Sequence, residues 1–202
     1  MKTNNISDPN LTNRITSWID ESVSSVSHTK NLINEITKTA DLVVSCLKSG
    51  HKIITLGNGG SAADAQHLAA EFIGRYLKER ISLPAISLTT DTSIITAIGN
   101  DYGFDYVFSR QCESIVNKDD VVIAFSTSGK SKNVINALLV SKNNGAHTIC
   151  LTGELGTELR NIVDVVLIAS SKSTPRIQEV HRILMHIICQ LVEEQFEPND
   201  KK

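Results

Sequence analysis

The sequence lacks a long apolar run, and it has no excess of charge of either sign. Its longest apolar stretches are strand-sized, such as VVIAF at 121–125, whereas a membrane-spanning helix needs about 18 or more apolar residues. The opening MKTNNISDPN has no apolar signal region, so we expect a cytoplasmic protein with no membrane partner. The formal net charge of -2 provides no general attraction to nucleic acid, so we expect no nucleic-acid partner either.

Paired cysteine motifs are also missing. The four cysteines (Cys46, Cys112, Cys150 and Cys189) form no CxxC pair and lie within apolar segments. This distribution favours reduced, buried thiols over disulfides or zinc knuckles. With 202 residues, of which 41% are hydrophobic and 21% charged, the composition is that of an ordinary globular domain, and we expect residues 1–202 to form one.

Short apolar runs alternate with helix-length segments after residue 50. The runs lie at 52–56, 84–88, 121–125, 147–151 and 164–168. Strands that alternate with helices predict an α/β fold: a single doubly wound parallel sheet of about five strands, with helices on both faces. We assign this α/β core to 51–196, with long helices at 62–78 and from Pro175 to about Gln195, followed by a polar tail at 197–202.

Two further helices are expected within residues 1–50. Apolar residues recur there at helical spacing. They are Leu11, Ile15, Trp18, Ile19, Val23 and Val26 in the first helix, and Ile36, Ala40, Val43 and Leu47 in the second.

A hydroxyl-rich turn follows the apolar run at 121–125. The residues Ser126-Thr127-Ser128-Gly129-Lys130-Ser131 join this strand to a helix. Hydroxyls and free amides at a helix N-terminus can bind a phosphate, although the same residues also serve as simple helix caps. A nucleotide P-loop is excluded because Ala124 stands where that motif needs its first glycine.

A second turn, GNGGSA at 57–62, also joins a strand to a helix. It fits the dinucleotide pattern GxGxxA, but the acidic residue expected roughly 20 residues later is missing, since the first acid after the next strand is Asp91. The turn therefore either serves a backbone bend alone or offers its amides to substrate oxygens.

His67 and Glu71 lie four residues apart in the helix expected at 62–78, so their side chains project from one face. In the last helix His186 lies in a polar strip beside the core face, whereas His181 falls outside that strip and is expected to be structural. From periodicity alone, a solvated surface pair and a core histidine remain alternatives to a catalytic or metal site.

Five segments together resemble the phosphoheptose isomerases, also called sedoheptulose-7-phosphate isomerases. They are GNGGSAADAQHLAAEFIGRY (57–76), AIGNDYGFDYVFSRQ (97–111), FSTSGKSKNVINAL (125–138), LTG (151–153) and RIQEVHRILMHII (176–188). The resemblance implies a flavodoxin-like sugar-isomerase (SIS) domain and a homotetramer, for which residues 1–50 would provide association surface. It also implies production of D-glycero-D-manno-heptose 7-phosphate from a sugar phosphate, for bacterial surface glycans such as lipopolysaccharide.

The resemblance also implies site residues. It assigns the acid/base roles to Glu71 and His186, and zinc ligation to His67, Glu71, Gln178 and His186. It implies substrate contacts from Asn58, Gly59, Gly60, Glu71, Arg75, Asn100, Asp101, Ser126, Thr127, Ser128, Ser131 and Gln178.

Two other functions are compatible with the same fold. One is a non-catalytic SIS scaffold that binds the bacterial replication-initiator protein, and the other is a module that senses sugar phosphates. Neither requires an acid/base pair, so the presence of both Glu71 and His186 favours the isomerase.

Overall fold

The computed structural model describes residues 9–197, so the predicted tail beyond Glu197 lies outside the described residues. Five parallel strands form one sheet in the order β2-β1-β3-β4-β5, which confirms the predicted doubly wound, flavodoxin-like sheet. The strands are β1 (Ile53–Gly57), β2 (Ala85–Ser87), β3 (Val121–Ser126), β4 (His147–Gly153) and β5 (Val165–Ala169). Each bound lies within two residues of the predicted apolar run, because strands covered on both faces are apolar along their whole length.

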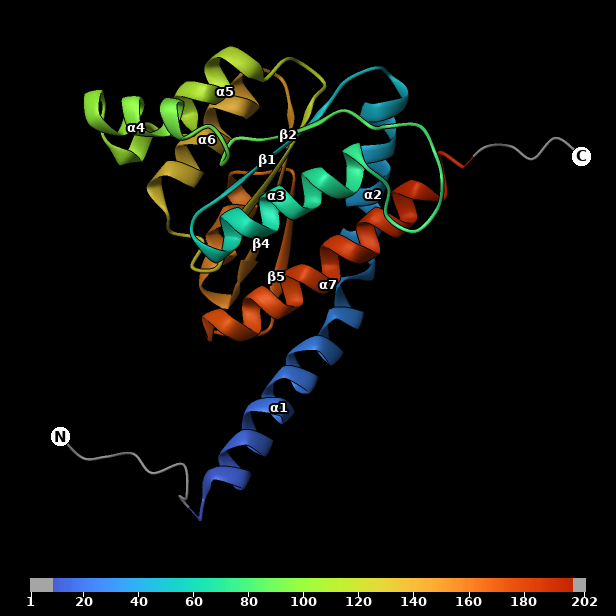
Figure 1. The fold of residues 1–202 in the computed structure, drawn as a ribbon, viewed down its shortest axis with the longest axis vertical. Coiled ribbons are helices and arrows are strands. Elements are labelled where there is room, and N and C mark those ends of the chain that lie inside the picture. Colours follow the sequence, from blue (N-terminus) through green and yellow to red (C-terminus); the bar gives the residue numbers. More distant parts are fainter. Residues whose placement is uncertain (1–8, 198–202) are drawn as a thin grey trace, which may run out of the picture.

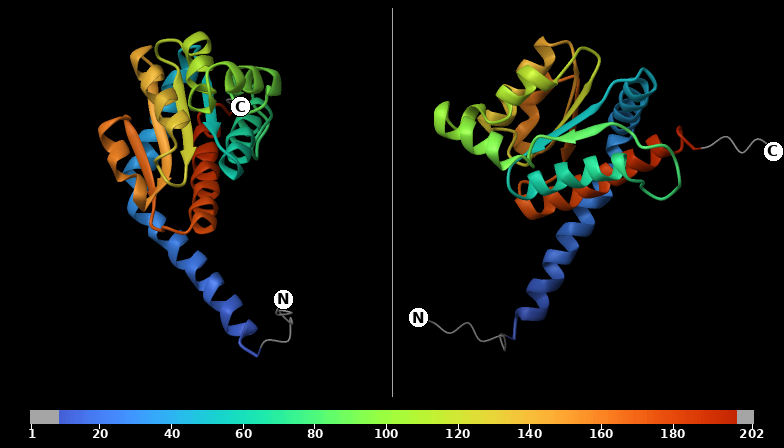
Figure 2. Two further views of the ribbon diagram at one scale, coloured as in Figure 1. Left: turned by 90° about the vertical axis from the view of Figure 1, so that its left-hand side faces the viewer. Right: turned by 45° about the horizontal axis from the view of Figure 1, so that its top comes forward.

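Helices cover both faces of the sheet (Figures 1 and 2). The helices are α1 (Leu11–Ser27), α2 (Ile33–Lys48), α3 (Gly60–Ile73), α4 (Thr92–Asp101), α5 (Ser109–Ile115), α6 (Lys132–Asn143) and α7 (Thr174–Glu193). Short 3₁₀ turns η1, η2 and η3 occupy His28–Leu32, Phe104–Tyr106 and Glu154–Asn161. One core cluster packs α2, α3 and α7 on the sheet, and the other packs α5 and α6 on the opposite face.

The two N-terminal helices are present as predicted, but α1 buries little of its apolar face. It extends away from the sheet and the other helices (Figure 1). Large apolar side chains remain exposed along it, with Trp18 at 47%, Ile19 at 57% and Val23 at 59%. The four cysteines are free and buried, as predicted. No helix within residues 9–197 is both long and apolar enough to span a bilayer.

The helix predicted at 62–78 is shorter than expected, and this prediction was wrong at its C-terminal end. The helix α3 ends at Ile73, and Gly74 leaves the helical conformation. The backbone amides of Tyr76, Leu77 and Lys78 instead donate to the carboxylate of Glu193. A tertiary partner on α7 therefore replaces the bonds that a continuing helix would have supplied.

The sheet brings the two predicted turns together. Strand order reverses between β1 and β3, which are hydrogen-bonded neighbours. The glycine turn follows β1 and the hydroxyl turn follows β3, so both lie outside the carboxyl ends of these strands. Ligands of open α/β sheets bind at this type of position.

Candidate active site

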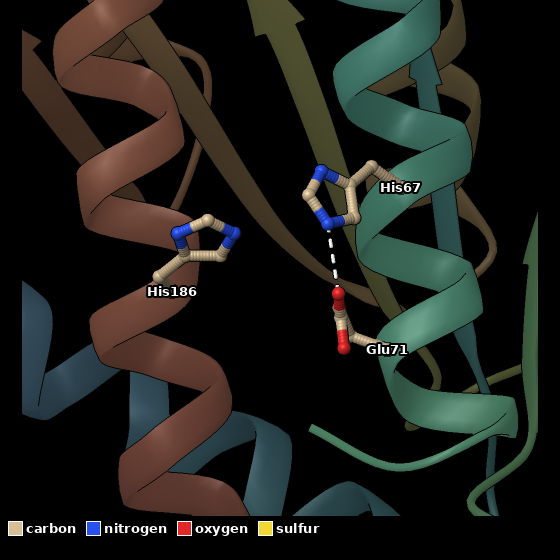
Figure 3. Close-up of side chains that lie close together, drawn as sticks. All are labelled: His67, Glu71 and His186. Carbon is tan, nitrogen blue, oxygen red and sulfur yellow. Dashed lines mark hydrogen bonds and ion pairs between the residues drawn. The ribbon is translucent and has the colours of Figure 1, made fainter. Parts of the chain in front are cut away.

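Three predicted site residues converge between α3 and α7. His67 and Glu71 lie one turn apart on α3, and the Nε2 of His67 is 2.7 Å from the Oε1 of Glu71. His186 projects toward them from α7 (Figure 3), with its ring centroid 5.2 Å from that of His67 and the two rings edge to face. The helical spacing predicted that His67 and Glu71 lie close together. His186 joins them because α3 packs against α7.

The three side chains could hold a metal ion. One ligand atom from each of His67, Glu71 and His186 lies within 4.8 Å of the other two, and all three residues are partly buried. Two imidazole nitrogens and one carboxylate oxygen form a common donor set for zinc. A fourth position would then remain for an amide oxygen, water or substrate.

His186 favours its neutral form. Burial lowers the pKa of His186 below its ordinary value, and the neighbouring His67 lowers it further, whereas Glu71 opposes the shift. A neutral imidazole carries the lone pair that metal ligation or proton acceptance requires.

An ion pair ties α3 to α7 one turn away from this cluster. Arg182 donates from Nη2 to the Oδ1 of Asp64 at 2.8 Å, and Asp64 is only 1% exposed. Asp64 precedes His67 by three residues and Arg182 precedes His186 by four, so the pair lies on the same helix faces as the cluster. It therefore holds the two halves of the site together.

Gln178, which the resemblance assigned as a ligand, lies on α7, and its side chain packs against the N-terminal end of α3. It lines an open pocket of about 540 Å³ together with Arg182, Ile183 and His186. Its amide occupies space that only a glycine at position 60 leaves open, since a Cβ built on Gly60 would lie 2.3 Å from the Nε2 of Gln178. The side chain thus connects the glycine turn to the pocket wall.

The hydroxyl turn has the features of an anion site. Ser131 immediately precedes α6, and the amide of Lys130 bonds the Oγ of Ser128 at 3.2 Å. The Oγ of Ser126 is buried and has no hydrogen-bond partner among residues 9–197. Gly129 has a φ of 64° and packs against Gly156, where a Cβ on Gly129 would lie 2.3 Å from the Cα of Gly156. The turn is therefore held closely against the chain that follows β4.

Asn58 links the glycine turn to α6, the helix that follows the hydroxyl turn. Its side-chain amide donates to the Oδ1 of Asn133 and accepts from the Nδ2 of Asn133, each at 2.9 Å. Asn133 is buried at the start of α6. The sequence interpretation did not single out Asn133, because nothing in the chain pattern shows that positions 75 residues apart pair.

Three other predicted substrate contacts are not joined to the cluster. Asn100 bonds Asp101 at 2.7 Å at the exposed end of α4, and Arg75 pairs with exposed Glu79 at 3.1 Å. Within residues 9–197, no hydrogen bond or ion pair connects any of the three to His67, Glu71 or His186.

Two further residues, His181 and Tyr76, were not assigned to the site from the sequence. His181 is fully buried, as expected for a structural residue, and burial lowers its pKa to about 4 although the backbone of Thr152 opposes the shift. Tyr76, which the predicted longer helix would have placed on a helical face, instead lies with its ring 5.6 Å from that of His186.

Comparison with known proteins decides the family. A family profile described as SIS domain matches residues 17–153. The phosphoheptose isomerase of Geobacter sulfurreducens is 52% identical over 169 residues, which cover 84% of this chain and 89% of the relative. That of Geotalea uraniireducens is 56% identical over 162 residues, covering 80% and 86%. The chain belongs to the phosphoheptose isomerase family of SIS-domain proteins.

Solved structures agree with this membership. The phosphoheptose isomerase GmhA of Neisseria gonorrhoeae superposes with a TM-score of 0.85 at 41% identity, covering 91% of this chain and 99% of that one. The Francisella tularensis phosphoheptose isomerase gives 0.87 at 34% identity, covering 91% and 98%. The Vibrio vulnificus NanR protein complexed with ManNAc-6P shares the fold alone. It is 20% identical with a TM-score of 0.63, and the match covers 89% of this chain and 62% of that chain.

Proposed function

We propose that this phosphoheptose isomerase family member interconverts sedoheptulose 7-phosphate and D-glycero-D-manno-heptose 7-phosphate. The observation that carries the proposal is the His67–Glu71–His186 cluster, which joins two groups able to transfer protons across the gap between α3 and α7. A sensor or a scaffold would have no use for such a pair.

The reaction needs two proton transfers at adjacent carbons. A base removes a proton from C1 of the ketose, the electron pair of the broken C1–H bond forms the C1=C2 double bond of an enediol, and the C2 oxygen receives the carbonyl π pair and takes up a proton. A proton is then returned to C2 while the O1 hydroxyl loses one, which leaves an aldehyde at C1. Glu71 and His186 face each other across the site, so one can act at carbon while the other shuttles the hydroxyl proton.

We assign a zinc ion to His67, Glu71 and His186, whose donor atoms suit that metal, and we assign Gln178 as its fourth ligand. When bound, zinc would polarise the substrate oxygens and stabilise negative charge that develops on them. Glu71 would be a weaker base if zinc held it tightly, and Gln178 would be a weak zinc ligand. For both reasons we expect the affinity for zinc to be moderate.

The substrate would lie between the two turns. We assign its phosphate to Ser126, Thr127, Ser128 and Ser131, where the helix dipole and free amides favour a dianion. We assign its hydroxyls and carbonyl to Asn58, Gly59, Gly60, Glu71, Arg75, Asn100, Asp101 and Gln178. The packing of Gln178 against Gly60 supports the assignment of these two residues.

The enzyme would act as a homotetramer in the cytoplasm and supply heptose for surface glycans such as lipopolysaccharide. The exposed apolar side chains of α1, including Trp18 and Val23, support association, because a second copy could cover them. Sedimentation of the purified protein measures this directly.

One assay separates the three functions. The protein is incubated with sedoheptulose 7-phosphate while the aldose is followed by NMR, and binding is measured in parallel by calorimetry. Turnover supports the isomerase. Binding without turnover would instead identify a sensor, and the absence of both would favour a scaffold.

A further inference from the structure

A buried ion pair joins the C-terminal ends of α3 and α7. The Nε of Arg80 lies 3.6 Å from the Oε1 of Glu193, and the two side chains are 1% and 3% exposed. Arg80 follows α3, whereas Glu193 is the last residue of α7. The pair therefore lies at the opposite side of the His67–Glu71–His186 cluster from the Asp64–Arg182 pair.

Arg80 closes the end of the helix that carries Glu71. Its guanidinium donates to the backbone oxygens of Phe72 at 2.8 Å and Gly74 at 3.1 Å, and to that of Glu71 itself at 2.6 Å. Helix α3 stops at Ile73, so its last carbonyls lack the partners that a further helical turn would supply, although the carbonyl of Phe72 also accepts the amide of Leu83 at 3.0 Å. Arg80 thus fixes the backbone beside the acid/base residue.

Glu193 fixes the chain that leaves α3. Its carboxylate accepts the amides of Tyr76 at 2.9 Å, Leu77 at 2.8 Å and Lys78 at 3.0 Å. Burial alone would raise the pKa of Glu193, but these three donors and Arg80 outweigh it and leave the pKa below its usual value. The residue is thus a charged acceptor for three successive backbone donors.

This anchor determines where the Tyr76 ring lies. The ring is tilted by 31° against that of His186, with 5.6 Å between the centroids. Tyr76 has no side-chain hydrogen bond within the described chain, so its position depends on the backbone that Glu193 holds. The ring then covers one side of the imidazole, while His67 covers another.

We propose that Glu193 is a positioning residue for the active site: by anchoring residues 76–78 it holds the Tyr76 ring against His186 and thereby orients the imidazole toward Glu71. This inference rests on the proposed isomerase function for its kinetic consequence, but not for its structural one. Small errors in the placement of reacting groups can reduce rates by about 100-fold.

The test compares two pairs of variants. Glu193→Gln keeps the size of the side chain but removes its charge and one acceptor oxygen, and Glu194→Gln is its exposed control on the next residue. Tyr76→Leu removes the ring, whereas Tyr76→Phe keeps it. The readouts are the His186 resonance in protein labelled at histidine ¹³Cε1, assigned with His186→Gln, and the separate values of kcat and KM.

We expect the His186 resonance to shift in Tyr76→Leu and in Glu193→Gln, and to keep its position in both controls. We expect kcat to fall about 10- to 100-fold in the first two variants with little change in KM, because the phosphate is held elsewhere. The double variant Tyr76→Leu/Glu193→Gln should lose no more kcat than the worse of its two single variants.

An unmoved His186 resonance in Tyr76→Leu would overturn the inference, as would a kcat loss in Glu193→Gln with an unmoved resonance. If Glu193→Gln does not fold, the two Tyr76 variants decide, since Tyr76 is only partly buried. If the His186 resonance shifts as expected in the variants but the wild-type protein shows no turnover, the proposed function is refuted while the positioning role of Glu193 is supported.

Discussion

Replacing Gly60 by alanine displaces Gln178 without changing the chemistry of Gln178. The added Cβ would lie 2.3 Å from Nε2, whereas ordinary contacts begin at 3.4 Å, so the amide must move by about 1 Å. Gly60 is the first residue of α3, where alanine suits the backbone and adds about 0.5–1 kcal/mol of stability. We therefore expect unchanged or higher thermal stability with a 10- to 100-fold loss of kcat/KM.

Calorimetric unfolding and steady-state kinetics measure the two effects. Gly99→Ala is the matched control, because its Cβ in α4 would meet only Val107 at an ordinary 3.8 Å. Gln178→Ala should show a similar loss, and the double variant should be little worse than either single variant. Full activity in Gly60→Ala would refute the reasoning, since it would show that the position of Gln178 does not matter.

Three other predictions test separate parts of the account. Ser128→Asp should raise KM severely at unchanged fold, because a carboxylate repels the phosphate; unaltered KM would remove the hydroxyl turn from the site. Dialysis against a chelator should lower activity or melting temperature and added zinc should restore it, whereas active protein without bound metal by elemental analysis would leave only the acid/base role. The pKa of His181 is about 4 in the folded protein, against an ordinary value of 6.5. As the pH falls, the unfolded chain therefore binds the proton before the folded chain does. Up to about 3 kcal/mol of folding stability is lost between pH 6.5 and 4. Urea unfolding should show a shallower loss in His181→Met, and equal pH profiles would contradict this origin.

Much of the fold could be predicted from the sequence because its signals are local. The buried strands are continuous apolar runs, and the i, i+4 spacing of His67 and Glu71 requires only a helix. The end of α3 could not be predicted in this way. The local pattern predicted a helix to residue 78, whereas the amides of residues 76–78 bond to Glu193, which lies 115 to 117 residues away in the chain.

The site was predictable in part for the same reason. Periodicity placed His186 on a polar strip but could not show that this strip faces α3, which depends on how the two helices pack. The Asn58–Asn133 and Asp64–Arg182 pairs likewise join positions distant in the chain. The resemblance to a known family provided the ligand and substrate assignments, and all of them stay predictions.

Turnover of two single variants tests the central claim most directly. Glu71→Gln and His186→Gln preserve size and hydrogen bonding, so each should remain a folded oligomer by light scattering and circular dichroism. Each should lose at least about 100-fold in kcat on sedoheptulose 7-phosphate, because general acid/base catalysis contributes about 10²–10⁴ in rate. Glu158→Gln, at an exposed position of η3, should keep wild-type turnover. Near-wild-type turnover in either Glu71→Gln or His186→Gln would contradict the proposed acid/base pair.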